Sequence, residues 1–122
     1  MRQIIILDAN AILRYIIDDI PEQADIVETA LQNEEVLLLP EVVAEVVYVL
    51  SKYYNLPHAK VSEHLERFFV DAGCDSDTLV NAVKTFGSKN LDFVDCVLYE
   101  YSKQQNYIIL TFDDKLKRLI KA

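Results

Sequence analysis

The sequence predicts a single α/β domain in which a parallel β-sheet is covered by helices on both faces. Short, continuous apolar runs alternate with longer stretches of helical periodicity along the 122 residues, which is the pattern of β-α-β units. The apolar runs do not alternate with polar residues, as expected for strands that are buried on both faces. The chain contains only two glycines and no Pro/Gly-rich linker, so residues 1–122 are expected to form one domain.

The helices are predicted from apolar periodicity and from proline positions. Ile12, Leu13 and Ile16 share one face of a first helix. Pro21 and Pro40 each suit the first turn of a helix, where a missing N–H does no harm. In chain order the predicted elements are a strand at 3–7, a helix at 10–19, a helix from Pro21, a strand at 36–39, a helix from Pro40 to about Tyr54, a helix from Pro57 to about Asp71, helices at 76–88 and 91–105, a strand at 107–110 and a helix at 114–121.

Carboxylates follow the first and the third of these strands. Asp8 ends the run "IIIL", and Asp113 comes shortly after "YIIL". In a parallel sheet the carboxyl ends of the strands meet at one edge, where ligands bind, so we expect the two carboxylates to lie close together. Asn10 and Thr111 are expected at the same edge, although either side chain is equally suited to a local capping or turn hydrogen bond. Asp is also a common helix N-cap, which gives each carboxylate a structural alternative.

Two further carboxylates lie on predicted helices. Glu45 stands at the border of an apolar helix face, although from its spacing alone a solvated helix edge is the simpler explanation. Asp95 has Leu91 four residues before it and Tyr99 four residues after it, so it is flanked by apolar groups. A carboxylate held against apolar surface is unfavourable unless it is paired or bound to a metal. Asp92 has a simpler explanation as a first-turn residue near the positive end of the helix dipole.

Together, Asp8, Glu45, Asp95 and Asp113 are candidate ligands of a hard cation. Four carboxylates gathered without a counter-ion would repel one another and take up protons. Mg²⁺ and Mn²⁺ prefer carboxylate and water ligands. Sites of this kind commonly hydrolyse phosphodiester bonds, so the sequence predicts a metal-dependent hydrolase of phosphodiesters.

The composition excludes several other classes of protein. No apolar stretch approaches the roughly 20 residues that span a bilayer, and no signal peptide is recognisable at the N-terminus. Cys74 and Cys96 form no CxxC motif, which favours free thiols in the cytoplasm. His58 and His64 are six residues apart, the wrong spacing for a shared metal on one helix face. The net charge of −8 opposes nucleic-acid binding unless bound cations neutralise part of it locally.

Four segments resemble PIN-domain ribonucleases, and most closely the VapC toxins of prokaryotic toxin–antitoxin pairs. These segments are "ILDANAILRYI", "PEVVAEVVYVL", "LDFVDCVLYE" and "ILTFDDKLKRL", and together they span nearly the whole chain in the family's order. Asp8, Glu45, Asp95 and Asp113 match the acidic positions of the family, and Asn10 and Thr111 match positions that are often polar.

The resemblance implies a three-layer sandwich with an acidic centre that uses Mg²⁺ or Mn²⁺. It also implies endoribonuclease activity on single-stranded RNA, homodimerisation, and inhibition by a cognate antitoxin protein. Two departures from the family are visible: only three strands are clear, so any further strand would come from 72–76, and the chain is unusually acidic. Basic residues must therefore line the RNA path, and the candidates are Arg14, Lys52, Lys89, Lys115, Lys117 and Arg118.

Two other functions remain open from the sequence. An apolar strand ending in Asp8 also suits a phosphatase or phosphotransferase with a covalent aspartyl nucleophile, but such enzymes usually carry a second aspartate at the position of Asn10. Alternatively, an inactive domain with an acidic groove would dock a partner that carries arginine. Acyl-phosphate labelling of Asp8 distinguishes the first alternative, and metal titration distinguishes the second.

Overall fold

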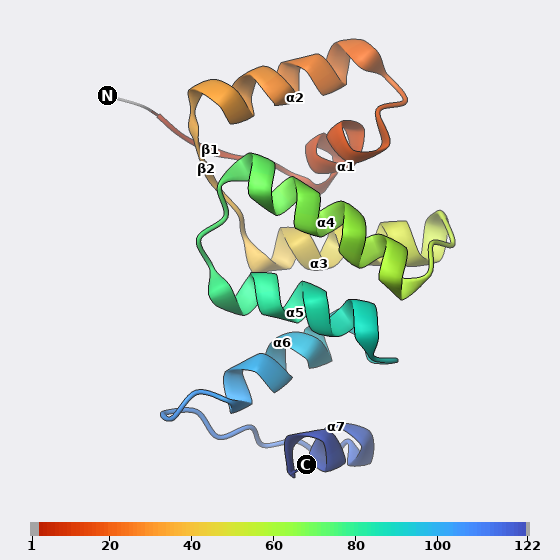
Figure 1. The fold of residues 1–122 in the computed structure, drawn as a ribbon, viewed down its shortest axis with the longest axis vertical. Helices are drawn as coiled ribbons and strands as arrows, with labels where there is room; N and C mark the ends of the chain where they lie inside the picture. The colour runs from red at the N-terminus through yellow and green to blue at the C-terminus, as the bar shows by residue number, and fades with distance from the viewer. Residues whose placement is uncertain (1–2, 122) are drawn as a thin grey trace.

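The structure is a computed structural model that describes residues 3–121, and its helices and strands alternate as expected only in the first part of the chain (Figure 1). The elements are β1 (Ile4–Ile6), α1 (Ala9–Ile17), α2 (Pro21–Asn33), β2 (Glu35–Leu37), α3 (Pro40–Tyr48), a π-helix η1 (Val49–Tyr53), α4 (His58–Ala72), α5 (Asp77–Ser88), α6 (Phe93–Ser102) and α7 (Asp114–Lys121).

The predicted helices are all present, and their ends follow local chemistry. Pro21 and Pro40 occupy the first turns of α2 and α3, and the Ser76 side chain accepts a hydrogen bond from the Leu79 N–H at the start of α5. Helix α4 ends at Gly73, which adopts a left-handed conformation with φ of 65° that glycine tolerates best. The helix predicted from Pro40 to Tyr54 is helical almost throughout, but its second part is a π-helix, which the periodicity does not reveal.

The sheet is smaller than predicted. It contains β1 and β2 alone among residues 3–121, paired in parallel with Ile5 opposite Val36. Ile5 packs against the helices, whereas Ile4 and Ile6 are 62% and 55% exposed. The prediction of an α/β fold with a parallel sheet is therefore confirmed, but helices cover only the Ile5 face of β1, and the three-layer sandwich is formed only in part.

The prediction of a strand at residues 107–110 is wrong in this structure. These residues form an irregular segment between α6 and α7, without a partner in the sheet. Figure 1 shows the reason: β1, β2, α1 and α2 lie at one end of the long axis, and α6 and α7 lie at the other, with α3, α4 and α5 between them. An apolar run becomes a strand only where a neighbouring strand accepts its hydrogen bonds. Residues 72–76 likewise form no strand.

A continuous apolar core links the helices. Helix α5 packs against both α4 and α6, and α1 packs against α2 and α3. The largest side chains that are almost completely buried come from α1, η1, α4 and α7, and they are Ile12, Leu50, Leu65, Phe68 and Leu116. Cys74 and Cys96 are free thiols. Among residues 3–121 no helix combines the length and apolar character needed to cross a membrane.

Candidate acidic site

The N-terminus of α6 brings three carboxylates into electrostatic contact. Asp92 is the N-cap residue of α6, and Asp95 lies in its first turn. Asp113, at the start of α7, also acts on Asp95. Burial, and then the neighbouring charges of Asp92 and Asp113, raise the pKa of Asp95 above its usual range, whereas Lys115 opposes this shift. Asp95 is thus a partly buried carboxylate on which two like charges and one cation act.

The negative charge of Asp95 also acts on a buried thiol of the same helix, that of Cys96. The thiol of Cys96 is completely buried, and its pKa rises to about 12, chiefly through burial and then through the charge of Asp95. Asp92 makes no side-chain cap hydrogen bond, so its carboxylate oxygens remain available for another ligand. Asp92 also borders an apolar cavity of about 340 Å³ beside the exposed ring of Tyr48 and the hydroxyl of Ser51. The Ser51 hydroxyl oxygen is buried and has no hydrogen-bond partner among residues 3–121.

Asp8 and Glu45 are not part of this group. Asp8 is exposed at the start of α1, and Glu45 is exposed on α3. Residues 107–110 do not join β1, so the predicted meeting of Asp8 with Asp113 at one sheet edge does not occur. Among residues 3–121 no group of three or more His, Cys, Asp or Glu side chains is close enough together to hold a metal ion. The four predicted ligands are therefore spread along the molecule, because α1, which follows Asp8, and α7, which follows Asp113, lie far apart along the long axis, and α3, which carries Glu45, lies between them (Figure 1).

Both carboxylates that were predicted after strands act as helix caps. Asp8 Oδ1 accepts a hydrogen bond from the Ala11 N–H at 2.8 Å, and Asp113 Oδ1 accepts one from the Leu116 N–H at 2.9 Å. The structural alternative noted from the sequence is thus realised at both positions. One oxygen of each carboxylate is engaged in this way, and the second oxygen is free to bind another ligand.

We expect Asp8→Ala to lower the free energy of unfolding by about 1 kcal/mol, because it removes the N-cap of α1. Asp8→Asn should leave stability nearly unchanged, because asparagine caps helices as well as aspartate does. Urea unfolding of the two variants measures both effects. Equal stability of Asp8→Ala and the wild type would contradict the capping role.

Two of the other candidate residues, Arg14 and Thr111, make local hydrogen bonds. Arg14 Nη1 donates to Asp19 Oδ2 at 2.8 Å, whereas the buried Nε of Arg14 has no hydrogen-bond partner among residues 3–121. Thr111 Oγ1 accepts a hydrogen bond from the Asp113 N–H at 3.1 Å and helps to orient the start of α7. Asn10 is exposed in the first turn of α1.

A basic cavity lies next to the acidic group. It has a volume of about 310 Å³ and is lined by Lys89, Asn90, Lys115 and Arg118, together with two leucines. Lys115 takes part in both features, because it acts on Asp95 and also donates a hydrogen bond to the Asn90 carbonyl. Three of the predicted cations therefore line one cavity, and one of them, Lys115, acts on Asp95.

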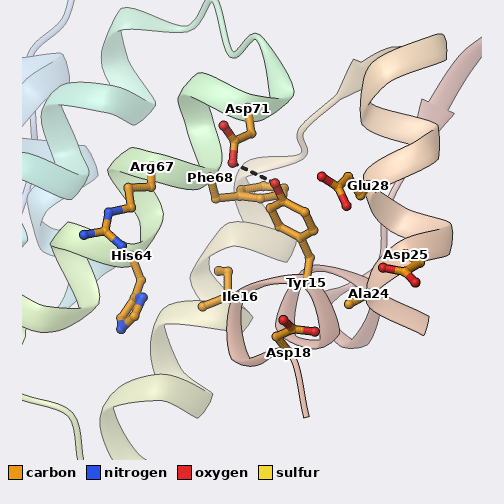
Figure 2. Close-up of a pocket in the computed structure, with 10 residues that line it drawn as sticks. All are labelled: Tyr15, Ile16, Asp18, Ala24, Asp25, Glu28, His64, Arg67, Phe68 and Asp71. Carbon is orange, nitrogen blue, oxygen red and sulfur yellow. Dashed lines mark hydrogen bonds between the residues drawn. The ribbon is translucent and has the colours of Figure 1, made fainter. Parts of the chain in front are cut away.

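A second polar cavity, between α1, α2 and α4, was not predicted from the sequence (Figure 2). It has a volume of about 310 Å³, and none of the predicted site residues lines it. The Tyr15 hydroxyl donates to Asp71 Oδ2 at 2.7 Å, and Glu28 faces the same space from α2. Tyr15 and Asp71 are 56 residues apart, and no local sequence pattern indicates such a pair. The contact joins α1 to α4, which is a structural role.

We expect the free energy of unfolding to decrease less at alkaline pH in Tyr15→Phe than in the wild type. Burial and the Asp71 hydrogen bond raise the pKa of Tyr15 to about 12. Between pH 10 and 12 the unfolded chain loses the phenol proton while the folded chain keeps it, so this group's contribution to stability is complete below pH 10 and declines as the pH rises. Each pKa unit corresponds to about 1.4 kcal/mol, and partial solvent exposure of the side chain reduces the total to about 1–2 kcal/mol. Unfolding free energies at pH 8 and 11.5 measure the effect. An identical decrease in wild type and variant would contradict it.

Comparison with known proteins identifies the family. The family model of the PIN domain matches residues 5–122. No curated protein and no solved structure matches the chain.

Proposed function

Because the chain belongs to the PIN domain family, whose members are generally metal-dependent nucleases, we propose that it is an endoribonuclease that depends on Mg²⁺ or Mn²⁺. The observation that carries this proposal is the position of Asp95 in the first turn of α6, where the charges of Asp92 and of Asp113, just before α7, both act on it. Oxygen donors of this kind suit hard cations better than any other protein ligand does.

A single chain in this conformation does not hold a complete metal site. Within the described residues no three metal-ligating side chains lie close enough together. Of the four predicted ligands, Asp95 and Asp113 act on each other electrostatically, together with Asp92, whereas Asp8 and Glu45 lie apart from them. The fold therefore has to bring these parts together before a cation can bind all four predicted ligands.

The surroundings of the acidic group support RNA as the substrate. The net charge of −8 repels phosphates over most of the surface, but Lys89, Lys115 and Arg118 line one cavity, and Lys115 also acts on Asp95. Phosphate contacts from lysine and arginine provide most of the affinity for nucleic acids. On the other side of Asp92, the exposed ring of Tyr48 offers a surface on which an unpaired base can stack.

The resemblance to VapC toxins extends the proposal to a toxin that a cognate antitoxin inhibits. An arginine of the antitoxin would pair with the carboxylates of Asp92 and Asp95 through charge-assisted hydrogen bonds. The same resemblance supports a homodimer. A cytoplasmic location agrees with the two free thiols, Cys74 and Cys96.

A docking module without catalytic activity is the second candidate. The absence of a three-ligand group among residues 3–121 favours it. Such a module would use the acidic surface to bind an arginine-bearing partner and would need no cation.

Cleavage of an end-labelled RNA of mixed sequence, with Mn²⁺, Mg²⁺ or EDTA, tests the proposal. We expect fragments with either metal and none with EDTA. Mn²⁺ binding, measured by calorimetry on the same preparation, provides a second readout. A folded protein that neither cleaves RNA nor binds Mn²⁺ would overturn the nuclease proposal and favour the docking module.

A further inference from the structure

The apolar cavity that Asp92 borders, called here the α3–α6 cavity, has the character of a site for a small flat molecule. Its volume is about 340 Å³, and it is lined by residues of α3, η1, α5 and α6 and by His58 at the start of α4. Ligand sites in proteins are commonly cavities of roughly 300–1,000 Å³ in which a few polar groups orient the ligand. The apolar part of this lining consists of Ala44, Val47, Phe86, Phe93 and Val94.

Ser51 lines this cavity with a hydroxyl group that lacks a partner. Its oxygen is buried and forms no hydrogen bond among residues 3–121. A buried polar group without a partner is unfavourable, and serines within helices usually avoid this by bonding to a carbonyl of the preceding turn. Ser51 belongs to the π-helix η1, a rare geometry that frequently occurs at functional sites. Both features indicate a ligand that pairs with the hydroxyl.

His58 supplies a second polar group, and its hydrogen-bonding role is fixed. Its Nδ1 lies 3.0 Å from the carbonyl oxygen of Phe86 and 3.2 Å from that of Lys89. Carbonyl oxygens only accept hydrogen bonds, so Nδ1 carries a proton, and Nε2 of the neutral ring is an acceptor. The imidazole is stacked on the Phe86 ring with 3.8 Å between centroids. The cavity is therefore lined by one residue that offers an acceptor and one that offers a hydroxyl.

Three exposed residues relate the cavity to a nucleic acid and to the acidic group. Tyr48 is 65% exposed, and its ring is a surface on which a base can stack. Lys52 lines the same cavity and provides a cation for a phosphate. Asp92 also lines it and acts on Asp95 at the start of α6. A strand of RNA bound at the acidic group would therefore pass the cavity.

We propose that the α3–α6 cavity binds one unpaired adenine of a single-stranded RNA, an inference that rests on the proposed ribonuclease function. The complement of an acceptor and a hydroxyl is an amino group next to a ring nitrogen. Adenine and cytosine carry this pair, whereas guanine and uracil carry a carbonyl oxygen in place of the amino group. That oxygen would face the lone pair of His58 Nε2. Adenine, as a purine, also has the larger surface for stacking on Tyr48.

An apolar side chain of a partner protein suits the cavity less well than a base does. It would fill the apolar part but would leave the Ser51 hydroxyl buried and unpaired. A base fills the same space and pairs with the hydroxyl. Sites that are built to hydrogen-bond a ligand reject analogues without the bonding group. The two occupants therefore differ in a testable way, because a site for an apolar side chain does not distinguish nucleosides by their amino group.

The first test compares the binding of adenosine and inosine to the purified protein in EDTA, by titration with NMR detection. Inosine has a carbonyl oxygen where adenosine has the amino group, and neither nucleoside carries a phosphate, so no cation is needed. We expect adenosine to bind at least about five-fold more tightly than inosine, as for other base contacts through hydrogen bonds. Equal dissociation constants, or no binding of adenosine, would overturn the adenine site.

Ser51→Ala tests the hydroxyl itself. It should weaken adenosine binding by about five-fold, the equivalent of one hydrogen bond. It should not lower the midpoint of urea unfolding, because the free protein loses only an unpaired buried hydroxyl. Ser102→Ala is the matched control, since Ser102 is a half-buried helical serine whose hydroxyl donates to the Tyr99 carbonyl outside the cavity. Unchanged adenosine binding by Ser51→Ala would overturn the proposed contact.

The second test maps the cuts in the end-labelled RNA of mixed sequence with Mn²⁺. We expect cuts at a fixed distance from adenines in the wild type, and loss of this preference in Ser51→Ala. A protein that prefers adenosine to inosine but cleaves no RNA would refute the nuclease proposal and leave the adenine site standing. Metal-dependent cuts without any relation to adenine would overturn the role of the cavity and leave the nuclease proposal standing.

Discussion

Asp95→Asn is expected to reduce metal-dependent RNA cleavage by at least about 100-fold, the size of effect seen when the ligand set of a metal site is disturbed. The two side chains have nearly the same shape, so the change removes only the charge. Asp95 is the carboxylate on which Asp92, Asp113 and Lys115 all act. Loss of its charge therefore weakens cation binding at the centre of the group.

The same substitution should not destabilise the metal-free protein. Burial and two like charges raise the pKa of Asp95, which means that its ionised form is held unfavourably. Asp77→Asn is the matched control, because Asp77 stands in the first turn of the neighbouring helix α5 and is exposed. The control should change the initial cleavage rate by less than about two-fold. Equal rates for Asp95→Asn and Asp77→Asn would contradict a role of Asp95 in cleavage.

Local signals in the sequence predict the helices well because each signal acts within one turn. The prolines at 21 and 40 lie in the first turns of α2 and α3, as predicted. The apolar run at 107–110 shows the limit of such reasoning. Its composition suits a strand, but strand formation depends on a distant partner, and in the single chain the intervening helices keep that partner away.

The candidate site follows the same division between local and distant information. Apolar neighbours at helical spacing identified Asp95 as a partly desolvated carboxylate, and the raised pKa bears this out. The pairing of Tyr15 with Asp71, and that of the Thr85 hydroxyl with the buried Glu100 at 2.8 Å, had no such signal. Both pairs join helices that are brought together only by tertiary packing, so their partners are invisible in a short window of sequence.

Gly87→Ala is expected to lower the free energy of unfolding by about 2 kcal/mol, within the usual range for an overpacked core. A Cβ atom at Gly87 would lie 2.6 Å from the Cβ of Ser62 and 2.7 Å from its hydroxyl oxygen. Ser62 is buried on α4, and both Cβ atoms are fixed by their helices, so no side-chain rotation relieves the contact. Helices α4 and α5 would have to move apart. This loss exceeds the gain of about 1 kcal/mol that alanine gives a helix interior relative to glycine.

A double-mutant cycle with Ser62→Gly isolates this contact. Removal of the Ser62 side chain leaves room for the new methyl group, so Gly87→Ala in the Ser62→Gly background should be neutral or stabilising, because only the helix propensity of alanine then remains. The coupling between the two sites, obtained from urea unfolding of the four proteins, should be about 2–3 kcal/mol. Ser62→Gly also removes the hydrogen bond from the Ser62 hydroxyl to Glu66, which is why the single variant is the reference for the double one. If Gly87→Ala stabilised the protein in both backgrounds by the same amount, the close approach of α4 and α5 at this position would be wrong, because helix propensity alone would then account for the effect.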